Sequence, residues 1–574
     1  MYTKTTFFCL LGLLFLSTLH AQTNELPRFQ TELESTADPV FVTPIGITTP
    51  PTLPVRTMAE WEELQALVIS WMGQPTILTE IVRAAREQCE VVVCTRNQLD
   101  LNTAKQTLTD NGVDISSNVS FVIAPLNSIW VRDYGPNCVY ANDVDSLYFV
   151  DWIYNRPTRP KDDTISTTLA PYFGVPLYST SAAPTDMVNT GGNFMSDGMG
   201  TAFASSLILN ENKIGNSYGV TPKSETQING IVSDFMGINR YIKMTPLPYD
   251  DIHHIDMHMK LIDEETLMVG KYPVGEADGP QIEANIQYVL SNFKSAFGTA
   301  YKVIRVPMPP QNGLYPNAGG DYRTYANAVF VNKTVIVPFY EEQYDTTAQR
   351  IWQEAMPGYK VVGIDCNDII PLFGAIHCIT KEVGVNDPIR IVHQELECQD
   401  NGLVGDYFIK ALIQHRSGIA SAKIYYTTDL AGTWQSSALI QGIIPTDEWF
   451  GSIPLQAVGT TVYYYIEATA SNGKTITRPI TAPEGYWKFC VTAGSATSNP
   501  GAVLLEIYPN PASAITVVPV QTKEKTKGSL LIYNSLGQLV QSLFEGEIPA
   551  GETNYFLDAS EYVPGAYLVK LQTG

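Results

Sequence analysis

The sequence predicts an α/β fold over residues 56–390, followed by two smaller modules that consist mainly of strands. In the first region, short apolar runs rich in β-branched residues, such as 91–93 and 267–270, alternate with helical patterns. From 391 onward the pattern changes to short strands separated by turn signals. With 574 residues, the chain is also too long for one ordinary hydrophobic core, so several domains are expected.

The N-terminal end has the features of a secretory signal. Lys4 provides a positive charge, the apolar run 7–16 is too short to span a bilayer, and Ala21 offers a small residue at the cleavage point. We therefore expect a signal peptide over 1–21 and a leader or extended arm, rich in Thr and Pro, over 22–55. No later stretch approaches the ~18 uninterrupted apolar residues of a membrane helix, so no integral membrane segment is expected in the mature protein.

Two patterns define further elements of the α/β region. The runs 328–331 and 334–337 flank a turn at 332–333, which predicts two successive strands. A helix is predicted over 281–297, because Pro280 marks its start and apolar residues recur on one helical face, namely Ile282, Ile286, Val289, Leu290 and Phe293.

Strand patterns dominate the C-terminal part of the chain. The run 462–468 leads through Asn472-Gly473, a strong hairpin signal, to another strand. About a hundred residues of this kind predict an immunoglobulin-like β-sandwich over 391–492. A linker of small residues over 493–502 separates it from a last module over 503–574.

The chain is strongly acidic, with 58 Asp and Glu against 36 Lys and Arg and a formal net charge of −22. This balance argues against a nucleic-acid partner, which normally binds a basic surface. A negative field attracts cationic substrates over a long range. Acidity that only favours solubility explains the composition equally well.

The cysteine pattern is not that of a disulfide scaffold. Of the eight cysteines, Cys9 belongs to the expected signal peptide, which leaves an odd number and therefore at least one free thiol. Cys398 and Cys490 lie near the two ends of the predicted sandwich and are candidates for a disulfide, but the sequence leaves this pairing open. A zinc site has weak support, because the chain has no C-x-x-C pair or H-E-x-x-H run.

Three motifs carry the candidate chemistry: WVRDYGP at 130–136, HHID at 253–256 and GAIHCIT at 374–380. Together they supply a thiol, an imidazole and two carboxylates, which are the groups needed to attack the carbon of a guanidinium. In this scheme Asp133 and Asp256 hold the planar cation by paired hydrogen bonds. The Cys378 thiolate attacks the central carbon, and protonated His254 donates to the departing ammonia.

At these motifs the chain resembles the guanidino-group-modifying superfamily, specifically the bacterial peptidylarginine deiminases of the Porphyromonas type and the related agmatine deiminases. The resemblance spans residues 55–390. It implies a pentein-like fold, a five-bladed pseudo-symmetric α/β propeller with the site at its centre. It also favours His254 over His253, since the family pattern is His-x-Asp. It places the segment 191–193 beside the site, and Asn327 there as a substrate-binding residue.

Substrate-binding residues are expected around the same motifs. Trp130 is predicted to line the slot for the alkyl stem of the substrate or to stack on the cation. Arg156 and Arg159, stiffened by neighbouring prolines, are predicted to hold a carboxylate. In the peptidylarginine deiminases, a comparable arginine pair with slightly closer spacing holds the terminal carboxylate of the substrate. No metal or organic cofactor is expected, because a guanidinium is already a charged electrophile once it is oriented.

The last module resembles the C-terminal sorting domain of Bacteroidetes type IX secretion. The resemblance rests on the runs 507–511, 533–537 and 564–571. Such domains generally close with one further strand that bears basic residues, whereas this chain stops at Gly574. We therefore expect a fragment or a trimmed chain.

The cysteine and the histidines also have simpler interpretations. A lone cysteine such as Cys378 is more often a buried small hydrophobe than a nucleophile. The adjacent His377 is able to lower the pKa of the thiol, but its side chain points away if both residues lie on a strand. His254 and Asp256 are two residues apart, so on a strand both project to one face. The alternative is that His254, together with His253 and His258, forms a metal cluster or an incidental polar patch.

The remaining candidates have structural alternatives as well. Asp133 is alternatively a salt-bridged turn residue, and Trp130 a plain core residue. Arg156 and Arg159 are alternatively solvated surface residues, and Asn327 part of a simple turn.

We therefore expect an exported cysteine hydrolase, secreted or attached to the cell surface, that converts arginine in peptides, preferably C-terminal arginine, to citrulline and ammonia. Its expected partners are arginine-bearing peptides or proteins and the type IX secretion machinery. The nearest enzyme alternative is an agmatine deiminase, and an amidinotransferase fits an exported protein less well. From a different class, the alternative is a catalytically silent surface-binding protein with the sandwich as an adhesin.

Overall fold

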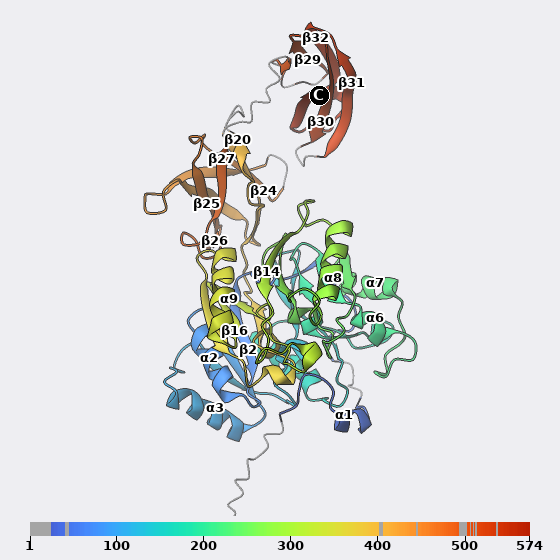
Figure 1. Ribbon diagram of the computed structural model, residues 1–574, viewed down its shortest axis with the longest axis vertical. Coiled ribbons are helices and arrows are strands. Elements are labelled where there is room, and N and C mark those ends of the chain that lie inside the picture. Colours follow the sequence, from blue (N-terminus) through green and yellow to red (C-terminus); the bar gives the residue numbers. More distant parts are fainter. Residues whose placement is uncertain are drawn as a thin grey trace, which may run out of the picture.

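Figure 1 shows the computed structural model, in which a large lobe of helices and strands lies beside two modules of strands. The structure describes residues 25–40, 45–400, 406–442, 446–492 and, apart from 506, 509, 511, 513 and 535–537, residues 502–573. The expected signal peptide over 1–21 and nearly all of the expected linker over 493–502 lie outside the described residues.

Residues 45–400, all of which the structure describes, contain five small sheets that repeat one pairing pattern. In each sheet a central strand pairs antiparallel with one neighbour and parallel with another. The central strands are β2 (Leu64–Ser70), β6 (Ser146–Tyr154), β10 (Thr201–Ser205), β13 (Thr266–Lys271) and β16 (Thr334–Phe339). Their antiparallel partners are β18 (Lys381–Gly384), β5 (Asn137–Ala141), β9 (Met195–Ser196), β12 (Met259–Leu261) and β15 (Val329–Val331).

The parallel partners of the central strands are β3 (Glu90–Thr95), β7 (Leu177–Thr180), β11 (Arg240–Met244), β14 (Lys302–Pro307) and β17 (Lys360–Asp365). Three further strands extend the first two sheets: β1 (Val55–Thr57), β4 (Val119–Ile123) and β8 (Val188–Asn189). The run of valines at 91–93 is buried on both faces of β3, which is typical of a parallel strand covered on both sides.

Helices connect each central strand to its parallel partner, because two parallel strands need a crossover connection. These helices are α2 (Pro75–Ala85), α5 (Ser166–Phe173), α6 (Leu207–Asn212), α7 (Glu225–Met236), α8 (Gly279–Asn292) and α9 (Glu342–Ala355), and α3 (Gln98–Asp110) leads from β3 to β4. Local sequence defines their ends. For example, α7 begins with a capping box between Ser224 and Gln227 and stops at left-handed Gly237.

The predicted elements of this region are present, with one helix shorter than expected. The runs 91–93, 267–270 and 334–337 lie within strands, and Asn332 forms the turn between β15 and β16 with a φ of 50°. The predicted helix over 281–297 begins at Gly279, with Pro280 in its first turn, but ends at Asn292. Phe293 caps it in an extended conformation while it still packs against the core.

The strands of the second module are hydrogen-bonded to one another in a single sheet, and the module has its own apolar core. Its strands are β19 (Arg390–Val392), β20 (Gln399–Asp400), β21 (Tyr407–Gln414), β22 (Ile419–Thr427), β23 (Gln435–Gln441), β24 (Glu448–Ile453), β25 (Thr461–Ala470), β26 (Thr475–Arg478) and β27 (Trp487–Thr492). The hairpin predicted at Asn472-Gly473 joins β25 to β26. A disulfide joins Cys398 to Cys490, so the pairing that the sequence left open is confirmed.

The last module packs two three-stranded sheets around a small apolar core. Its strands are β28 (Ala502–Leu504), β29 (Ile515–Thr522), β30 (Thr526–Asn534), β31 (Leu539–Ile548), β32 (Gly551–Asp558) and β33 (Tyr567–Thr573).

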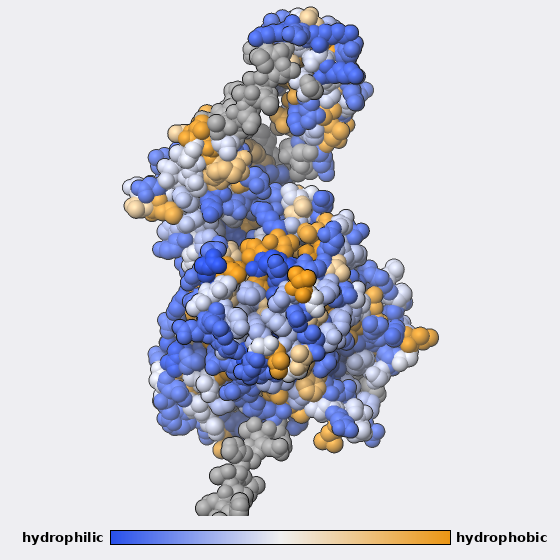
Figure 2. Space-filling view, viewed as in Figure 1, coloured by the Kyte–Doolittle hydropathy of each residue, from blue (hydrophilic) through white to orange (hydrophobic). Residues whose placement is uncertain are grey.

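Hydrophilic residues cover most of the face of the molecule in Figure 2, in keeping with its many acidic side chains. Within the described part of the chain, none of the helices combines the length and the apolar character that crossing a membrane requires.

We expect the Cys398–Cys490 bond to stabilise the second module, because it closes a loop across 92 residues of sequence. Replacing both cysteines by serine should lower the free energy of unfolding of this module by about 2–4 kcal/mol, measured by urea denaturation. A reductant should shift the transition of the parent protein and leave that of the double variant in place. Identical transitions for both proteins would contradict this role.

Candidate active site

The candidate residues sit at equivalent places in the five repeated sheets. Each of five residues comes just before the antiparallel partner of a different central strand: Asp133 before β5, Gly192 before β9, Asp256 before β12, Asn327 before β15 and Cys378 before β18. The short turns that carry them contact one another. The repeat therefore brings one functional segment from each sheet to a common point.

The turns are helical, not extended. Asp133 lies on α4 (Val131–Tyr134), His254 caps the 3-10 turn η3 (Ile255–Met257) that contains Asp256, and Cys378 lies on η6 (His377–Ile379). The expectation that His254 and Asp256 project from a strand is therefore wrong. His253 follows a turn and has a left-handed φ of 57°, and the extended residue His254 then leads directly into η3.

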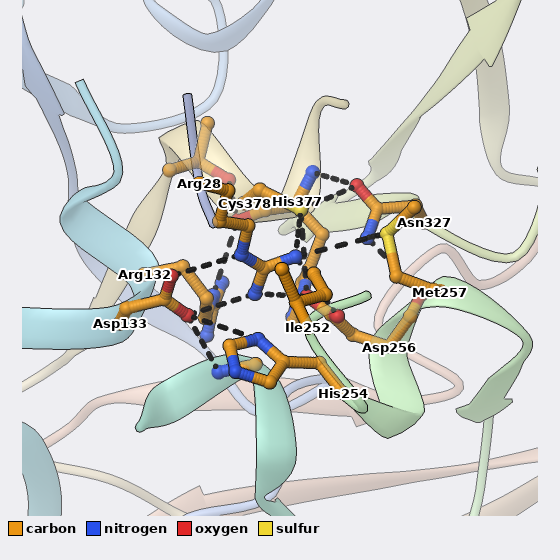
Figure 3. Close-up of polar contacts among 12 residues, drawn as sticks. Arg28, Arg132, Asp133, Ile252, His254, Asp256, Met257, Asn327, His377 and Cys378 are labelled. Carbon is orange, nitrogen blue, oxygen red and sulfur yellow. Dashed lines mark hydrogen bonds and ion pairs between the residues drawn. The ribbon is translucent and has the colours of Figure 1, made fainter. Parts of the chain in front are cut away.

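The site encloses the guanidinium of Arg28, a residue of the leader (Figure 3). Asp133 accepts from Nε at 2.8 Å and from Nη2 at 2.7 Å. Asp256 accepts from Nη1 and Nη2, each at 3.2 Å, so both carboxylates bind the cation with two oxygens. The Cys378 Sγ lies 2.6 Å from Nη1. Arg28 thus occupies the pocket in which the sequence predicts a substrate guanidinium.

Charge balance keeps the buried ion cluster ionised. Burial opposes the charge of Arg28, but Asp133 and Asp256 raise its pKa well above the usual range. Burial alone would raise the pKa of Asp133, yet Arg28 and His254 bring it down to about 2. Burial acts in the same direction on Asp256, and Arg28 and His377 hold its pKa far below normal. The two carboxylates therefore stay negative around a permanent cation.

The thiol and the imidazole are neutral in this state. Burial raises the pKa of Cys378 above its ordinary value, and the Arg28 cation opposes that rise. Burial, followed by repulsion from Arg28, lowers the pKa of His254 to about 3. The His254 Nδ1 lies 3.6 Å from Asp133 Oδ1, and neither ring nitrogen has a hydrogen-bond partner among the described residues. His254 is thus free to exchange a proton with a ligand.

Gly192 leaves the space in which the guanidinium and the imidazole meet. A Cβ at this position would lie 1.7 Å from Arg28 Nη2 and 2.8 Å from His254 Nδ1. The backbone N–H of Gly192 also donates to Asp133 at 3.1 Å. A glycine is required here by close approach, and the Gly-Gly-Asn segment at 191–193 lines the site as expected.

His377 points into the site and does not point away. Its Nδ1 lies 2.9 Å from Asp256, and its Nε2 lies 3.1 Å from both oxygens of Glu60. Lys260 in turn donates to Glu60 at 2.5 Å. Burial would raise the pKa of Glu60, but His377 and Lys260 hold it well below normal. This chain of contacts orients the Asp256 carboxylate, and sequence reasoning missed Glu60 and Lys260.

Asn327 fixes two of the turns relative to each other. Its Nδ2 donates to the Asp256 carbonyl at 3.0 Å, and its Oδ1 accepts from the His377 N–H at 3.1 Å. The Cys378 thiol lies 3.3 Å from the same oxygen. Arg132 adds a buried ion pair with Glu382 and donates to the His377 carbonyl at 3.1 Å. The nucleophile is therefore held from both sides.

Three of the four residues predicted to bind the substrate contact the leader. Trp130 donates through Nε1 to the Leu26 carbonyl at 2.8 Å, and Arg156 donates to the Arg28 carbonyl through Nε at 3.1 Å and Nη2 at 2.8 Å. Arg159 donates to the Phe29 carbonyl and pairs with Glu34, as described below. Both arginines are buried, so the interpretation as solvated surface residues is wrong.

Among the residues that the structure describes, no group of three or more His, Cys, Asp or Glu is arranged to hold a metal ion. Of the three clustered histidines, His254 faces Asp133, whereas the His253 Nδ1 lies 3.2 Å from the Leu247 carbonyl.

Comparison with known proteins identifies the family of the α/β region. The model of the family "Porphyromonas-type peptidyl-arginine deiminase" matches residues 56–383. The chain belongs to this family. It is therefore a deiminase, a hydrolase that acts on guanidino groups. The model "Secretion system C-terminal sorting domain" matches residues 506–574, which identifies a sorting domain for type IX export.

Individual relatives cover most of their own length in the α/β region. A Vibrio parahaemolyticus protein named "Putative agmatine deiminase" is 26% identical over 325 residues, 51% of this chain and 83% of its own. A protein of the same name from Legionella pneumophila is 27% identical over 281 residues, 46% of this chain and 75% of its own.

Solved structures show the same fold. The arginine deiminase structure from Porphyromonas gingivalis, described as putative, has 22% identity and a TM-score of 0.50, and it covers 57% of this chain and 98% of its own. The agmatine deiminase of Enterococcus faecalis has 21% identity and a TM-score of 0.50, and it covers 60% of this chain and 98% of its own.

The space beside Gly192 gives a direct steric test of the site. Gly192→Ala should reduce kcat/KM for any guanidino substrate by at least about 100-fold, or about 2.7 kcal/mol, because the new methyl group overlaps the position of Nη2. Gly230→Ala is the matched control, since a Cβ there meets nothing within 4 Å. Activity of the Gly192 variant near that of the control would show that the substrate binds elsewhere.

Proposed function

We propose that this protein is an exported cysteine hydrolase that converts peptidyl-arginine to citrulline and ammonia. The observation that carries the proposal is an arginine guanidinium held by Asp133 and Asp256, with the Cys378 sulfur 2.6 Å from Nη1. Family membership supports the chemistry, and the match to a sorting domain supports export to the cell surface or the medium. The assignment of roles below is ours.

In the proposed reaction, the neutral thiol–imidazole pair first becomes a thiolate and an imidazolium. The substrate cation favours the thiolate, since it lowers the pKa of the thiol, but it opposes the imidazolium, which Asp133 and Asp256 favour. The thiolate attacks the guanidinium carbon to form a C–S bond. His254 then gives its proton to the nitrogen at the position of Nη2, because Nη2 and the imidazole both lie next to Gly192. The C–N bond breaks and ammonia leaves.

The product of this first half is a cationic thiouronium adduct on Cys378. Water then attacks the same carbon, with His254 taking a proton, and the C–S bond breaks to give the ureido group of citrulline and the free thiol. Asp133 and Asp256 compensate the positive charge of the substrate and of the adduct throughout. Water supplies the oxygen, and the reaction needs no oxidant, metal or organic cofactor in this scheme.

The contact of Arg156 supports a peptide substrate over agmatine. Arg156 donates two hydrogen bonds to the main-chain carbonyl of Arg28. A C-terminal arginine places a carboxylate there, and a charged acceptor binds a guanidinium more strongly than a neutral carbonyl does. Agmatine has neither group. The names of the curated relatives nevertheless make agmatine the second candidate substrate.

We infer the following organisation for the whole chain. A signal peptide (1–21) and a leader (22–55) precede a catalytic domain (56–390), whose five sheets form the blades of a pentein propeller. An immunoglobulin-like domain (391–492), a linker (493–502) and the sorting domain (503–574) follow. The nucleophile, the imidazole and both carboxylates lie together, which argues against a catalytically silent adhesin.

Cys378→Ser should abolish turnover without unfolding the protein, because a hydroxyl is a far poorer nucleophile near neutral pH. Citrulline and ammonia should be measured with a C-terminal arginyl peptide, an internal arginyl peptide and agmatine. Cys366→Ser is the matched control, since this buried cysteine has no contact with the guanidinium among the described residues. Turnover by the Cys378 variant above one per cent of the parent, a difference of less than about 2.7 kcal/mol, would contradict covalent catalysis.

The peptide preference is expected to depend on Arg156. Arg156→Ala should raise KM for a C-terminal arginyl peptide by about 10- to 100-fold, or about 1.4–2.7 kcal/mol, with a smaller change in kcat. The value of kcat/KM for agmatine should change by less than about threefold, since agmatine lacks the carboxylate. Equal losses for both substrates would mean that Arg156 only maintains the structure of the site. Agmatine outranking the peptide in the parent enzyme would overturn the peptide-directed function.

A further inference from the structure

Leader residues 25–36 consist of a segment without regular structure, from which Arg28 enters the active site, followed by a short helix, α1 (Glu32–Thr36), labelled in Figure 1. The sequence of this region has no clear periodicity, so helix α1 was not predicted from it. Its first turn is closed by a capping box between Thr31 and Glu34. The helix thereby fixes Glu34 next to the segment that enters the site.

The main chain around Arg28 is held on both sides. The Leu26 carbonyl accepts from Trp130, and the Arg28 N–H donates to the Leu372 carbonyl at 2.9 Å. After Arg28, the Phe29 carbonyl accepts from Arg159 at 3.0 Å, and the Phe29 ring packs edge-on against Phe373 with centroids 5.7 Å apart. These contacts fix the backbone direction as well as the side chain.

A second buried ion pair secures the helix that follows. Arg159 donates from Nε to Glu34 Oε1 at 2.7 Å and from Nη2 to Oε2 at 2.9 Å. Burial would raise the pKa of Glu34, but its hydrogen bonds from Arg159 and Thr31 lower it to about 2. The pair is therefore charged at any physiological pH. The leader is anchored both through Arg28 and through α1.

Occupancy by Arg28 excludes every other guanidinium. Arg28 and Cys378 are both fully buried, and all four carboxylate oxygens of Asp133 and Asp256 bind the Arg28 side chain. Arg28 is also the only cationic side chain between residues 22 and 55. Because Arg28 is tethered to the domain that binds it, it competes for the site at an effective concentration in the millimolar range. A free substrate at a lower concentration therefore occupies the site less often than Arg28 does.

We propose that the leader is an intramolecular inhibitor, in which Arg28 acts as a substrate mimic and keeps the enzyme latent until the leader is displaced or cut away. This inference rests on the proposed function only for the identity of the competing substrate. The exposed stretch from Ser35 to Val40 lies just after the anchored part, where the backbone is accessible to a protease. A cut there converts the tethered ligand into a peptide that dissociates on dilution.

The first test measures access to Cys378 without any turnover. The full chain is treated with chloroacetamidine, a small cationic alkylating agent, and modification of Cys378 is followed by peptide mass spectrometry. Arg28→Ala should be modified at least tenfold faster than the parent, whereas Glu32→Gln, an exposed change on α1, should match the parent. Glu34→Gln, which removes the ion pair with Arg159, should give an intermediate rate. Equal rates for the parent, the Arg28 variant and the Glu34 variant would overturn the proposal.

The second test measures turnover of a C-terminal arginyl peptide. Arg28→Ala should raise kcat/KM at least tenfold, mainly by lowering KM, as loss of a competitive inhibitor requires. If the Arg28 variant is alkylated faster but forms no citrulline, the leader is an inhibitor and the proposed function is wrong. If the parent and the variant form citrulline at the same rate, the proposed function holds and the leader is not an inhibitor.

Position 28 of the purified parent protein should contain arginine by mass spectrometry. Citrulline there would overturn latency, because a neutral ureido group cannot form the two ion pairs that hold the leader. Thermal unfolding of each variant checks that the fold survives.

Discussion

The pairing of one guanidinium with two buried carboxylates is the interaction on which this site depends. Two like charges that share a dry pocket repel each other, and each pays a large desolvation cost unless a cation lies between them. Arg28 meets that requirement with four hydrogen bonds to Asp133 and Asp256. Without the leader, the same pocket is a strong receptor for any planar cation that fits it.

A second group of charges holds the carboxylates in place while the ligand changes. His377 connects Asp256 to Glu60, which pairs with Lys260, and Arg132 pairs with Glu382 while it donates to the His377 carbonyl. These residues belong to several of the five sheets. Their contacts therefore join the separate turns into one rigid site, in which the distances around the thiol are set before a substrate arrives.

Much of this site was predictable from the sequence, because its chemistry is concentrated in three short motifs. Asp133, His254, Asp256 and Cys378 are identifiable from residue type and order, and the structure brings them together around one guanidinium. The local conformation was less predictable. A spacing of two residues suits a strand, but the chain enters the 3-10 turn η3 directly after His254. Such a choice depends on tertiary contacts.

The contributions of Arg28 and Glu60 were out of reach of sequence reasoning for a different reason. Both act through contacts that span more than a hundred residues, and neither lies in a motif that marks it among similar residues. The one available signal was that Arg28 is the sole cation in the leader of an acidic chain. That signal gains meaning only when the pocket and its two carboxylates are known.

The leader also clarifies what the arginine pair recognises. Arg156 contacts the carbonyl of the bound arginine itself, whereas Arg159 contacts the next carbonyl and the Glu34 carboxylate. Under the proposed function, the two arginines would therefore act at different points of a bound chain: Arg156 would meet the carboxylate of a C-terminal arginine, and Arg159 would contact the residues that follow. A peptide that ends at arginine leaves Arg159 without a partner, and a chain that continues with an acidic residue at a suitable distance satisfies it. The leader consequently combines a substrate-like side chain with an anchor that a C-terminal arginine does not have. This anchor favours binding of the leader over binding of the substrate as long as the leader remains joined to the catalytic domain.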